Sequence, residues 1–97
     1  MRIMTGRVTL YFSDISGNKQ IKKRQMHIRS MLEAQKIPFE VVDVAQDQEA
    51  LGKMRRLVDD EEALPPQIMN GDVYCGTFEE FEASIEEGTL QEFLRLK

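Results

Sequence analysis

A single cysteine is the strongest nucleophile in this sequence. Because Cys75 is the only cysteine, the chain cannot form an internal disulfide or a cysteine-based zinc site. It ends a short run of strand-forming residues, and a free cysteine in a strand is usually a small buried hydrophobe. A modifiable thiol would instead need exposure and a lowered pKa. The only histidine, His27, has no carboxylate or serine at a catalytic spacing, and we expect it at the surface.

Two parallel strands and a hairpin are the expected sheet elements. Residues 7–12 and 39–44 favour strands, and the amphipathic segment 19–36 between them favours a helix that Pro38 ends. A helix between two strands makes those strands parallel. The second strand is almost continuously apolar, which predicts that both of its faces are covered. Asn70-Gly71 is a strong turn signal, so residues 67–69 and 72–75 are expected to pair as the hairpin.

Further helices are expected over residues 48–58, between Thr77 and Gly88, and from Leu90 onward. Thr77 and Glu80 have the spacing of a capping box. The fold class is therefore α/β: a mixed four-stranded sheet flanked by helices, in the order β-α-β-α-β-β-α-α. Residues 1–6 are expected to fray and residues 7–97 to form a single domain. With 31% charged and 41% apolar residues, the composition excludes disordered and collagen-like classes.

This order of elements resembles the thioredoxin-like fold in its small glutaredoxin form. Residues 64–76 (LPPQIMNGDVYCG) resemble the signature of the glutaredoxin-related family named for binding Src-homology-3 (SH3) domains and for glutamate richness. Residues 21–23 and 90–94 match that family too. The resemblance covers nearly the whole chain from residue 7 onward. It implies a glutaredoxin-like fold and a non-catalytic role as a protein-interaction adaptor or a modulator of glutaredoxin and redox signalling.

The redox motif of glutaredoxins has no counterpart in this chain. In those enzymes a Cys-x-x-Cys motif lies between the first strand and the first helix, where residues 16–19 stand here without a cysteine. A serine hydroxyl is not ionised at neutral pH and cannot form a mixed disulfide, so the reaction itself is lost. We therefore expect no enzymatic activity. The alternative is a weak monothiol oxidoreductase that uses Cys75 with glutathione.

A vestigial glutathione surface is the second implication of the resemblance. Glutaredoxins hold glutathione with the segment at a cis-proline and with a helix N-terminus that follows glycine. Pro66 and Gln67 correspond to the first device, Gly76 and Thr77 to the second, and Ser16 lies at the place of the lost thiol. The other interpretation is that Pro66 and Gly76 serve backbone geometry alone. Neither a bound cofactor nor a metal site is predicted.

Charge and proline spacing bear on partners. The net charge of −4 disfavours nucleic acid, and no apolar run approaches the roughly 20 residues of a membrane span. The adjacent prolines lack the Pro-x-x-Pro spacing and basic neighbour that SH3 domains read, so tight SH3 binding there is not expected. The lone cysteine favours the cytoplasm or the nucleus. A protein with an acidic patch is the partner that suits the basic face of the first helix, which carries Lys19, Lys22, Lys23, Arg24 and Arg29.

Overall fold

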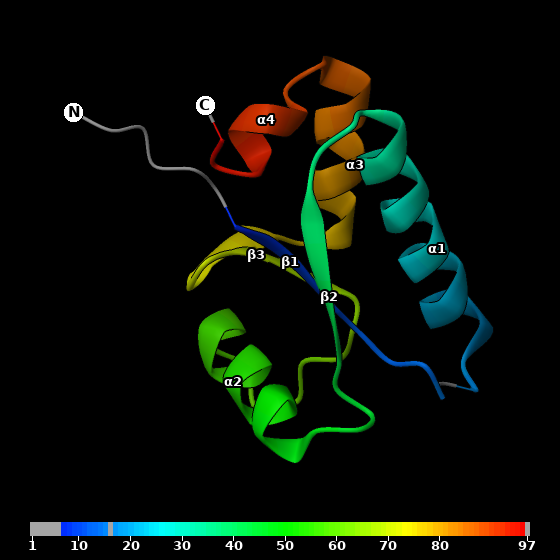
Figure 1. The fold of residues 1–97 in the computed structure, drawn as a ribbon, viewed down its shortest axis with the longest axis vertical. Coiled ribbons are helices and arrows are strands. Elements are labelled where there is room, and N and C mark those ends of the chain that lie inside the picture. The colour runs from blue at the N-terminus through cyan, green and yellow to red at the C-terminus, as the bar shows by residue number, and fades with distance from the viewer. Residues whose placement is uncertain (1–6, 16, 97) are drawn as a thin grey trace.

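The computed structural model of the chain describes residues 7–15 and 17–96 (Figure 1). The predicted order of elements is confirmed. The expectation that residues 1–6 fray lies outside the described residues. The elements are β1 (Val8–Phe12), α1 (Lys19–Ala34), β2 (Phe39–Asp43), α2 (Gln48–Val58), β3 (Gln67–Asn70), β4 (Val73–Gly76), α3 (Phe78–Glu87) and α4 (Leu90–Phe93).

The four strands form one mixed sheet in the order β2-β1-β3-β4. β1 pairs parallel with β2 and antiparallel with β3, and β3 and β4 form the predicted antiparallel hairpin. The prediction that both faces of the second strand are covered holds in part: Phe39 packs against the core beneath α1 and α3, and Val42 packs against the core beneath α2. β2 lies at the sheet edge and its residues are only partly buried, whereas the central strand β1 is buried over Val8–Tyr11. Pairing on both sides encloses β1, and no local pattern reports which strand is central.

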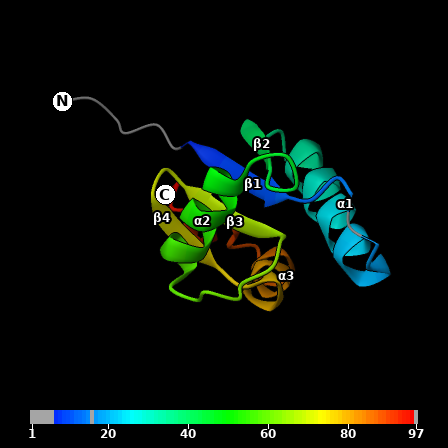
Figure 2. The same ribbon diagram turned by 90° about the horizontal axis from the view of Figure 1, so that it is seen from below.

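Helices cover the two faces of the sheet (Figure 2). The face toward α1 and α3 contributes Leu10 and Ile68 to a core that also contains Phe81 and Leu94. The face toward α2 contributes residues to a second core, whose buried members are Tyr11, Val44, Met54, Ala63 and Met69. Successive strand residues enter opposite cores because side chains alternate along a strand.

Local capping sets the helix boundaries. Asp47 accepts hydrogen bonds from the backbone N–H groups of Glu49 and Ala50, so α2 begins where the sequence predicted. α1 ends at Ala34, earlier than predicted, and Lys36 then takes a left-handed φ of 60°. Thr89 makes no side-chain capping bond. α4 is therefore positioned by the burial of Leu90 and not by its cap.

The C-terminal segment is held to the sheet by a polar side chain at the end of β3. The Asn70 amide donates to the carbonyl oxygen of Leu94 at 2.8 Å, and the backbone N–H of Arg7 donates to the Asn70 side-chain oxygen at 2.9 Å. Leu94 itself is fully buried. These contacts fix the end of the chain against the first strand and keep α4 beside α3.

Candidate functional site

Strand pairing brings four of the predicted surface residues together. Ile68 in β3 lies opposite Gly76 in β4. Because the hairpin strands are antiparallel, Pro66 and Gln67 at the start of β3 are neighbours of Gly76 and Thr77 at the end of β4. The Pro65–Pro66 peptide bond is cis, as the resemblance implied for Pro66. The fifth predicted residue, Ser16, lies outside the described residues.

The segment before β3 is tied down by side-chain hydrogen bonds. The Gln67 amide donates to the carbonyl oxygen of Leu64 at 2.8 Å, and the Arg55 guanidinium donates to that of Ala63 at 3.1 Å. Pro65 is buried. Leu64 is 57% exposed. The proline segment is thus a fixed loop with one displayed apolar residue, and it is not free to form the extended helix that SH3 domains bind.

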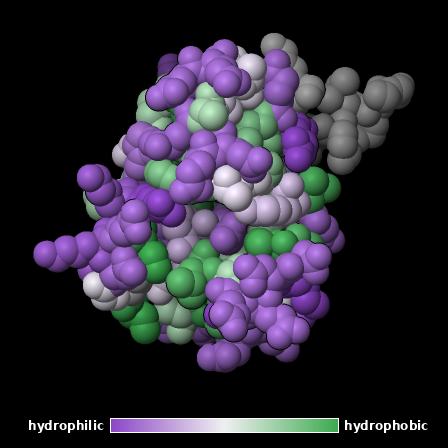
Figure 3. Space-filling model, turned by 180° about the vertical axis from the view of Figure 1, so that it is seen from behind, coloured by the Kyte–Doolittle hydropathy of each residue, from purple (hydrophilic) through white to green (hydrophobic). Residues whose placement is uncertain are grey.

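Apolar side chains gather on the molecular face where this loop runs. Figure 3 shows green side chains in the lower half of that face, between α1 and α2. Hydrophilic side chains cover most of the remainder. A patch of this kind, rimmed by polar residues, is typical of a protein-binding surface.

Gly76 is explained by its own geometry. Its φ of +147° is one that L side chains rarely adopt. A Cβ atom added there would lie 2.5 Å from the Glu80 carboxylate and 2.8 Å from the Phe93 ring. These contacts support the interpretation that Gly76 is required for backbone conformation and close packing.

The start of α3 already holds a carboxylate from its own helix. Glu80 accepts from the Thr77 backbone N–H at 2.9 Å, and the Thr77 hydroxyl accepts from the Glu80 backbone N–H at 3.1 Å. This is the predicted capping box. Burial is the main cause that raises the pKa of Tyr74, and Glu80, Cys75 and Glu79 raise it further. Glu79 and Glu80 also give the first turn of α3 a negative charge. A carboxylate of glutathione would meet this negative charge and compete with Glu80 for the Thr77 N–H.

Ser13, which follows β1, is held by a buried amide that sequence reasoning missed. The Ser13 backbone N–H donates to the Gln25 side-chain oxygen at 2.9 Å, and the Gln25 amide donates back to the Ser13 carbonyl at 3.2 Å. Gln25 is only 6% exposed. Its position on the apolar stripe of the helix, one turn from Ile21 and near Ile28, was the available signal. Beyond the loop, the Asn18 side chain caps α1 by accepting from two backbone N–H groups.

Cys75 is buried in the core beneath α1 and α3. It is 5% exposed and belongs to the cluster that contains Leu10 and Phe81. Burial raises the pKa of the thiol to about 11, although nearby Arg95 acts in the opposite direction. A buried, protonated thiol is a poor nucleophile and a poor metal ligand. Among the described residues, no three His, Cys, Asp or Glu side chains form a group that could hold a metal ion.

His27 lies at the surface, as predicted, with its side chain 40% exposed, and it also takes part in the α1–α3 contact. Its Nε2 lies 3.2 Å from the Glu82 carboxylate, and its ring meets Phe78 and Phe81 edge-on. Next to it, the Arg24 guanidinium lies 4.7 Å from the centre of the Phe78 ring. Helix–helix packing makes these contacts, and they carry no signal in local sequence spacing.

The family is decided by a match that spans nearly the whole chain. Residues 6–97 match the family model described as SH3-binding, glutamic acid-rich protein. The chain belongs to this family. The SH3 domain-binding glutamic acid-rich protein homolog of Drosophila melanogaster is 34% identical over 90% of this chain. The chain spans 63% of that relative's length.

Solved structures of an actin interacting protein and of a glutaredoxin are also similar to this chain. The actin interacting protein Aip5 of C. albicans superposes with a TM-score of 0.77 and 28% identity over 97% of each chain. Buckwheat glutaredoxin, solved with glutathione, superposes with a TM-score of 0.67 and 9% identity over 93% of this chain and 77% of its own. The glutaredoxin likeness establishes the thioredoxin-like fold, as predicted.

Proposed function

We propose that this chain is a glutaredoxin-like module without redox catalysis, which binds a protein partner through the surface around Leu64, Pro66 and Gly76. One observation carries the proposal: the only thiol is buried in the core, with its pKa raised to about 11. Thiol–disulfide exchange requires an accessible thiolate. The described start of α1, where glutaredoxins hold their thiol, has Gly17 and Asn18 instead.

The surface retains features that suit binding. It combines the exposed Leu64, a fixed cis-proline loop and the apolar patch visible in Figure 3. A rigid loop loses little conformational entropy on binding, and a displayed apolar residue supplies the buried area. The glutathione contact at Thr77 is occupied by Glu80, which favours a protein partner over the tripeptide. We further propose that the protein works in the cytoplasm or nucleus, where a lone free thiol stays reduced.

Site-specific photocrosslinking tests this surface. A photoreactive amino acid replaces Leu64 in one variant and Val73 in another, and both are exposed apolar residues, at 57% and 51%. Each variant is incubated with cytosol, and crosslinked partners are identified by mass spectrometry. We expect a defined adduct from position 64 and none from position 73. No adduct from either position, or the same adducts from both, would contradict the proposal.

Association with actin is a second candidate function. The observation that favours it is the likeness to the actin interacting protein of C. albicans over 97% of both chains. Co-sedimentation of the purified protein with actin filaments, with a catalytic glutaredoxin as a control of similar fold, measures it directly. If this chain stays in the supernatant at every actin concentration, binding to filaments is excluded.

Residues 64–68 remain a poor SH3 ligand, because their backbone is fixed and no Pro-x-x-Pro spacing is present.

A further inference from the structure

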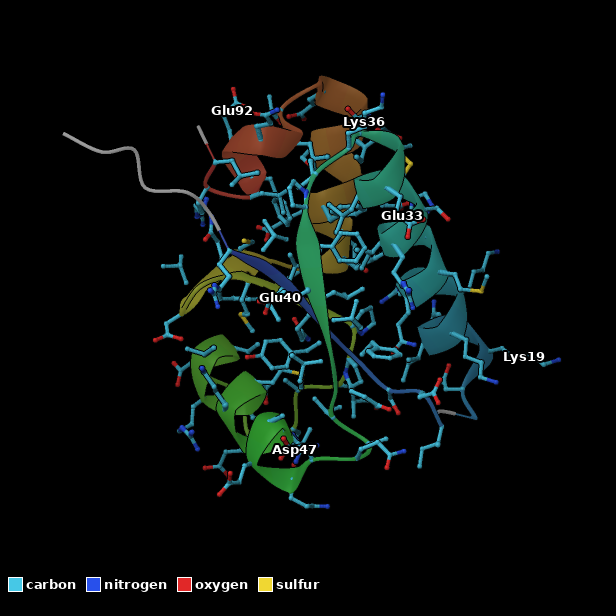
Figure 4. All side chains as sticks on the ribbon, viewed as in Figure 1. Lys19, Glu33, Lys36, Glu40, Asp47 and Glu92 are labelled. Atoms are coloured by element: carbon cyan, nitrogen blue, oxygen red, sulfur yellow. The ribbon has the colours of Figure 1, made fainter. Side chains whose placement is uncertain are left out.

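The basic residues of α1 are not explained by the stability of the helix. From Lys19 to Arg29 the helix carries five lysines and arginines, and its first acidic residue is Glu33 near the other end (Figure 4). The first turn contains no acidic side chain, and Lys19 and Lys22 lie in that turn, at the positive end of the helix dipole. The whole chain has a net charge of −4. Such a concentration of positive charge, against both the dipole and the overall charge, indicates a binding role.

The two edges of α1 differ in how their charge is compensated. Toward α3, the Arg24 guanidinium pairs with the Glu79 carboxylate at 3.3 Å, and the His27 Nε2 lies 3.2 Å from the Glu82 carboxylate. On the opposite edge, Lys22 and Arg29 have no ion-pair partner within the described part of the chain. The fold therefore engages Arg24 on the α3 edge internally, whereas both cations of the opposite edge, Lys22 and Arg29, are available to an external anion.

The open edge borders a shallow hollow with an apolar centre. The hollow has a volume of about 310 Å³ and lies between α1 and the β1–α1 loop. Met26 lies between Lys22 and Arg29 on the helix and is 69% exposed. The residues that line the hollow are Phe12, Ser13, Asp14, Lys22, Gln25, Met26 and Arg29. Asp14 is the one carboxylate among them, so the lining keeps an excess of positive charge.

The shape of the hollow is fixed before any partner binds. The reciprocal hydrogen bonds between Gln25 and Ser13 hold the loop against the helix. Asp14 is held in turn by its backbone N–H, which donates to the Asp43 carboxylate at 3.2 Å. A preformed hollow loses little entropy on binding. Methionine adapts its shape to different apolar partners, which suits a surface that receives a side chain.

We propose that this hollow binds an acidic peptide segment that carries a bulky apolar side chain. The apolar side chain would pack on Met26 and Phe12, while flanking carboxylates would pair with Lys22 and Arg29. Charge complementarity selects the acidic segment, and the exposed methionine selects the apolar residue within it. The proposal rests on the proposed function in that both require a protein partner. It places the contact on the edge of α1 that faces away from α3.

Fluorescence anisotropy with synthetic peptides tests the proposal. The probe is a short fluorescein-labelled peptide of Asp and Glu around a Leu-Phe pair. The double variant Lys22→Glu/Arg29→Glu is expected to weaken binding about tenfold or more, because two attractions become repulsions. The matched control Lys53→Glu/Arg56→Glu changes the net charge equally on α2, and it is expected to bind within about twofold of the wild type. Met26→Ser is expected to weaken binding as well.

Several outcomes would overturn this proposal. The first is an equal loss of peptide affinity in the two charge variants. The second is undiminished peptide binding by Lys22→Glu/Arg29→Glu. The third is an affinity for the Leu-Phe peptide no higher than that for the same peptide with Ser-Ser in place of Leu-Phe. Tighter binding to vesicles of anionic lipid, or self-association at low salt that Lys22→Glu/Arg29→Glu abolishes, would assign the hollow to another occupant. If the peptide fails to bind while crosslinks from position 64 persist, this inference fails and the proposed function stands.

Discussion

Access to the Cys75 thiol decides between a binding module and a monothiol enzyme. A water-soluble aromatic disulfide reagent reacts with accessible thiolates and releases a coloured product. We expect the native protein to react at least a thousandfold more slowly than the protein in strong denaturant. The ratio of the two rates should be on the order of the fraction of molecules whose core is open. The Cys75→Ala variant, which has no thiol, supplies the background rate.

The magnitude follows from ionisation and burial together. Raising the pKa from 9.0 to about 11 lowers the thiolate fraction at pH 7 from roughly one in a hundred to roughly one in ten thousand. A more basic thiolate is about tenfold more nucleophilic, so ionisation alone slows the reaction only about tenfold. The larger factor is burial, since the side chain is 5% exposed. If only global unfolding exposes it, a stability of about 5 kcal/mol gives a factor of several thousand, on the order of 10³–10⁴.

The two factors make the experiment decisive. The rate is measured across a urea series, beside the unfolded fraction determined by circular dichroism. If burial protects the thiol, the labelling rate rises in proportion to the unfolded fraction. A native rate within about tenfold of the denatured rate would mean that ionisation alone slows the thiol. Cys75 would then be accessible, and the argument for a module without redox chemistry would be refuted.

Further predictions concern the surface around Gly76. Gly76→Ala should destabilise the protein by about 2–4 kcal/mol, because φ is +147° and the new Cβ meets Glu80 and Phe93. The control Gly17→Ala, whose Cβ would have no atom within 4 Å, should change the free energy of unfolding by less than about 0.5 kcal/mol. Urea denaturation measures both variants, and equal effects would contradict the geometric explanation. Thr77→Ala should cost about 1 kcal/mol in the same assay through loss of the helix cap, and an unchanged midpoint would show that the cap contributes nothing. The contribution of Cys75 to the free energy of unfolding should be fully present below about pH 9 and be lost toward pH 11, because the unfolded thiol loses its proton before the folded one. Cys75→Ala should remove this part of the fall in stability and leave the part caused by the raised pKa of Tyr74. In a glutathione-dependent mixed-disulfide assay, Cys75→Ser and the wild type should give the same background rate, and a slower variant would indicate catalysis.

Local signals predicted most of the fold. The Asp47 cap, the capping box of Thr77 and Glu80, and the Asn70-Gly71 turn each act within a few residues, and each lies where the sequence predicted. The edge position of β2 was missed because apolar content does not report strand order. In β2 the apolar residues are only half-buried, so hydrophobicity alone overestimated how much of that strand is covered.

The candidate site was predictable where backbone geometry dominates. A proline opening β3 and a glycine ending β4 leave direct marks in the sequence, and the register brings them together. Which basic residues of α1 form ion pairs within the fold was not predictable. Lys22 and Arg24 are two positions apart, yet one is unpaired and the other lies against Phe78 and Glu79. Only the packing of α3 on one edge of α1 separates the two residues.

The start of α1 connects the lost chemistry with the binding role. In a redox member of this fold, the helix dipole and free amides at that point stabilise a thiolate. Here the Asn18 side chain occupies two of the amides, and Lys19 and Lys22 add positive charge that no carboxylate among residues 7–15 and 17–96 pairs with. Because no thiolate is present at the start of α1, the positive field of these lysines acts on an anion that approaches from outside. Because this helix start has no thiol, its positive charge is better explained by the proposed attraction of an acidic partner than by stabilisation of a thiolate.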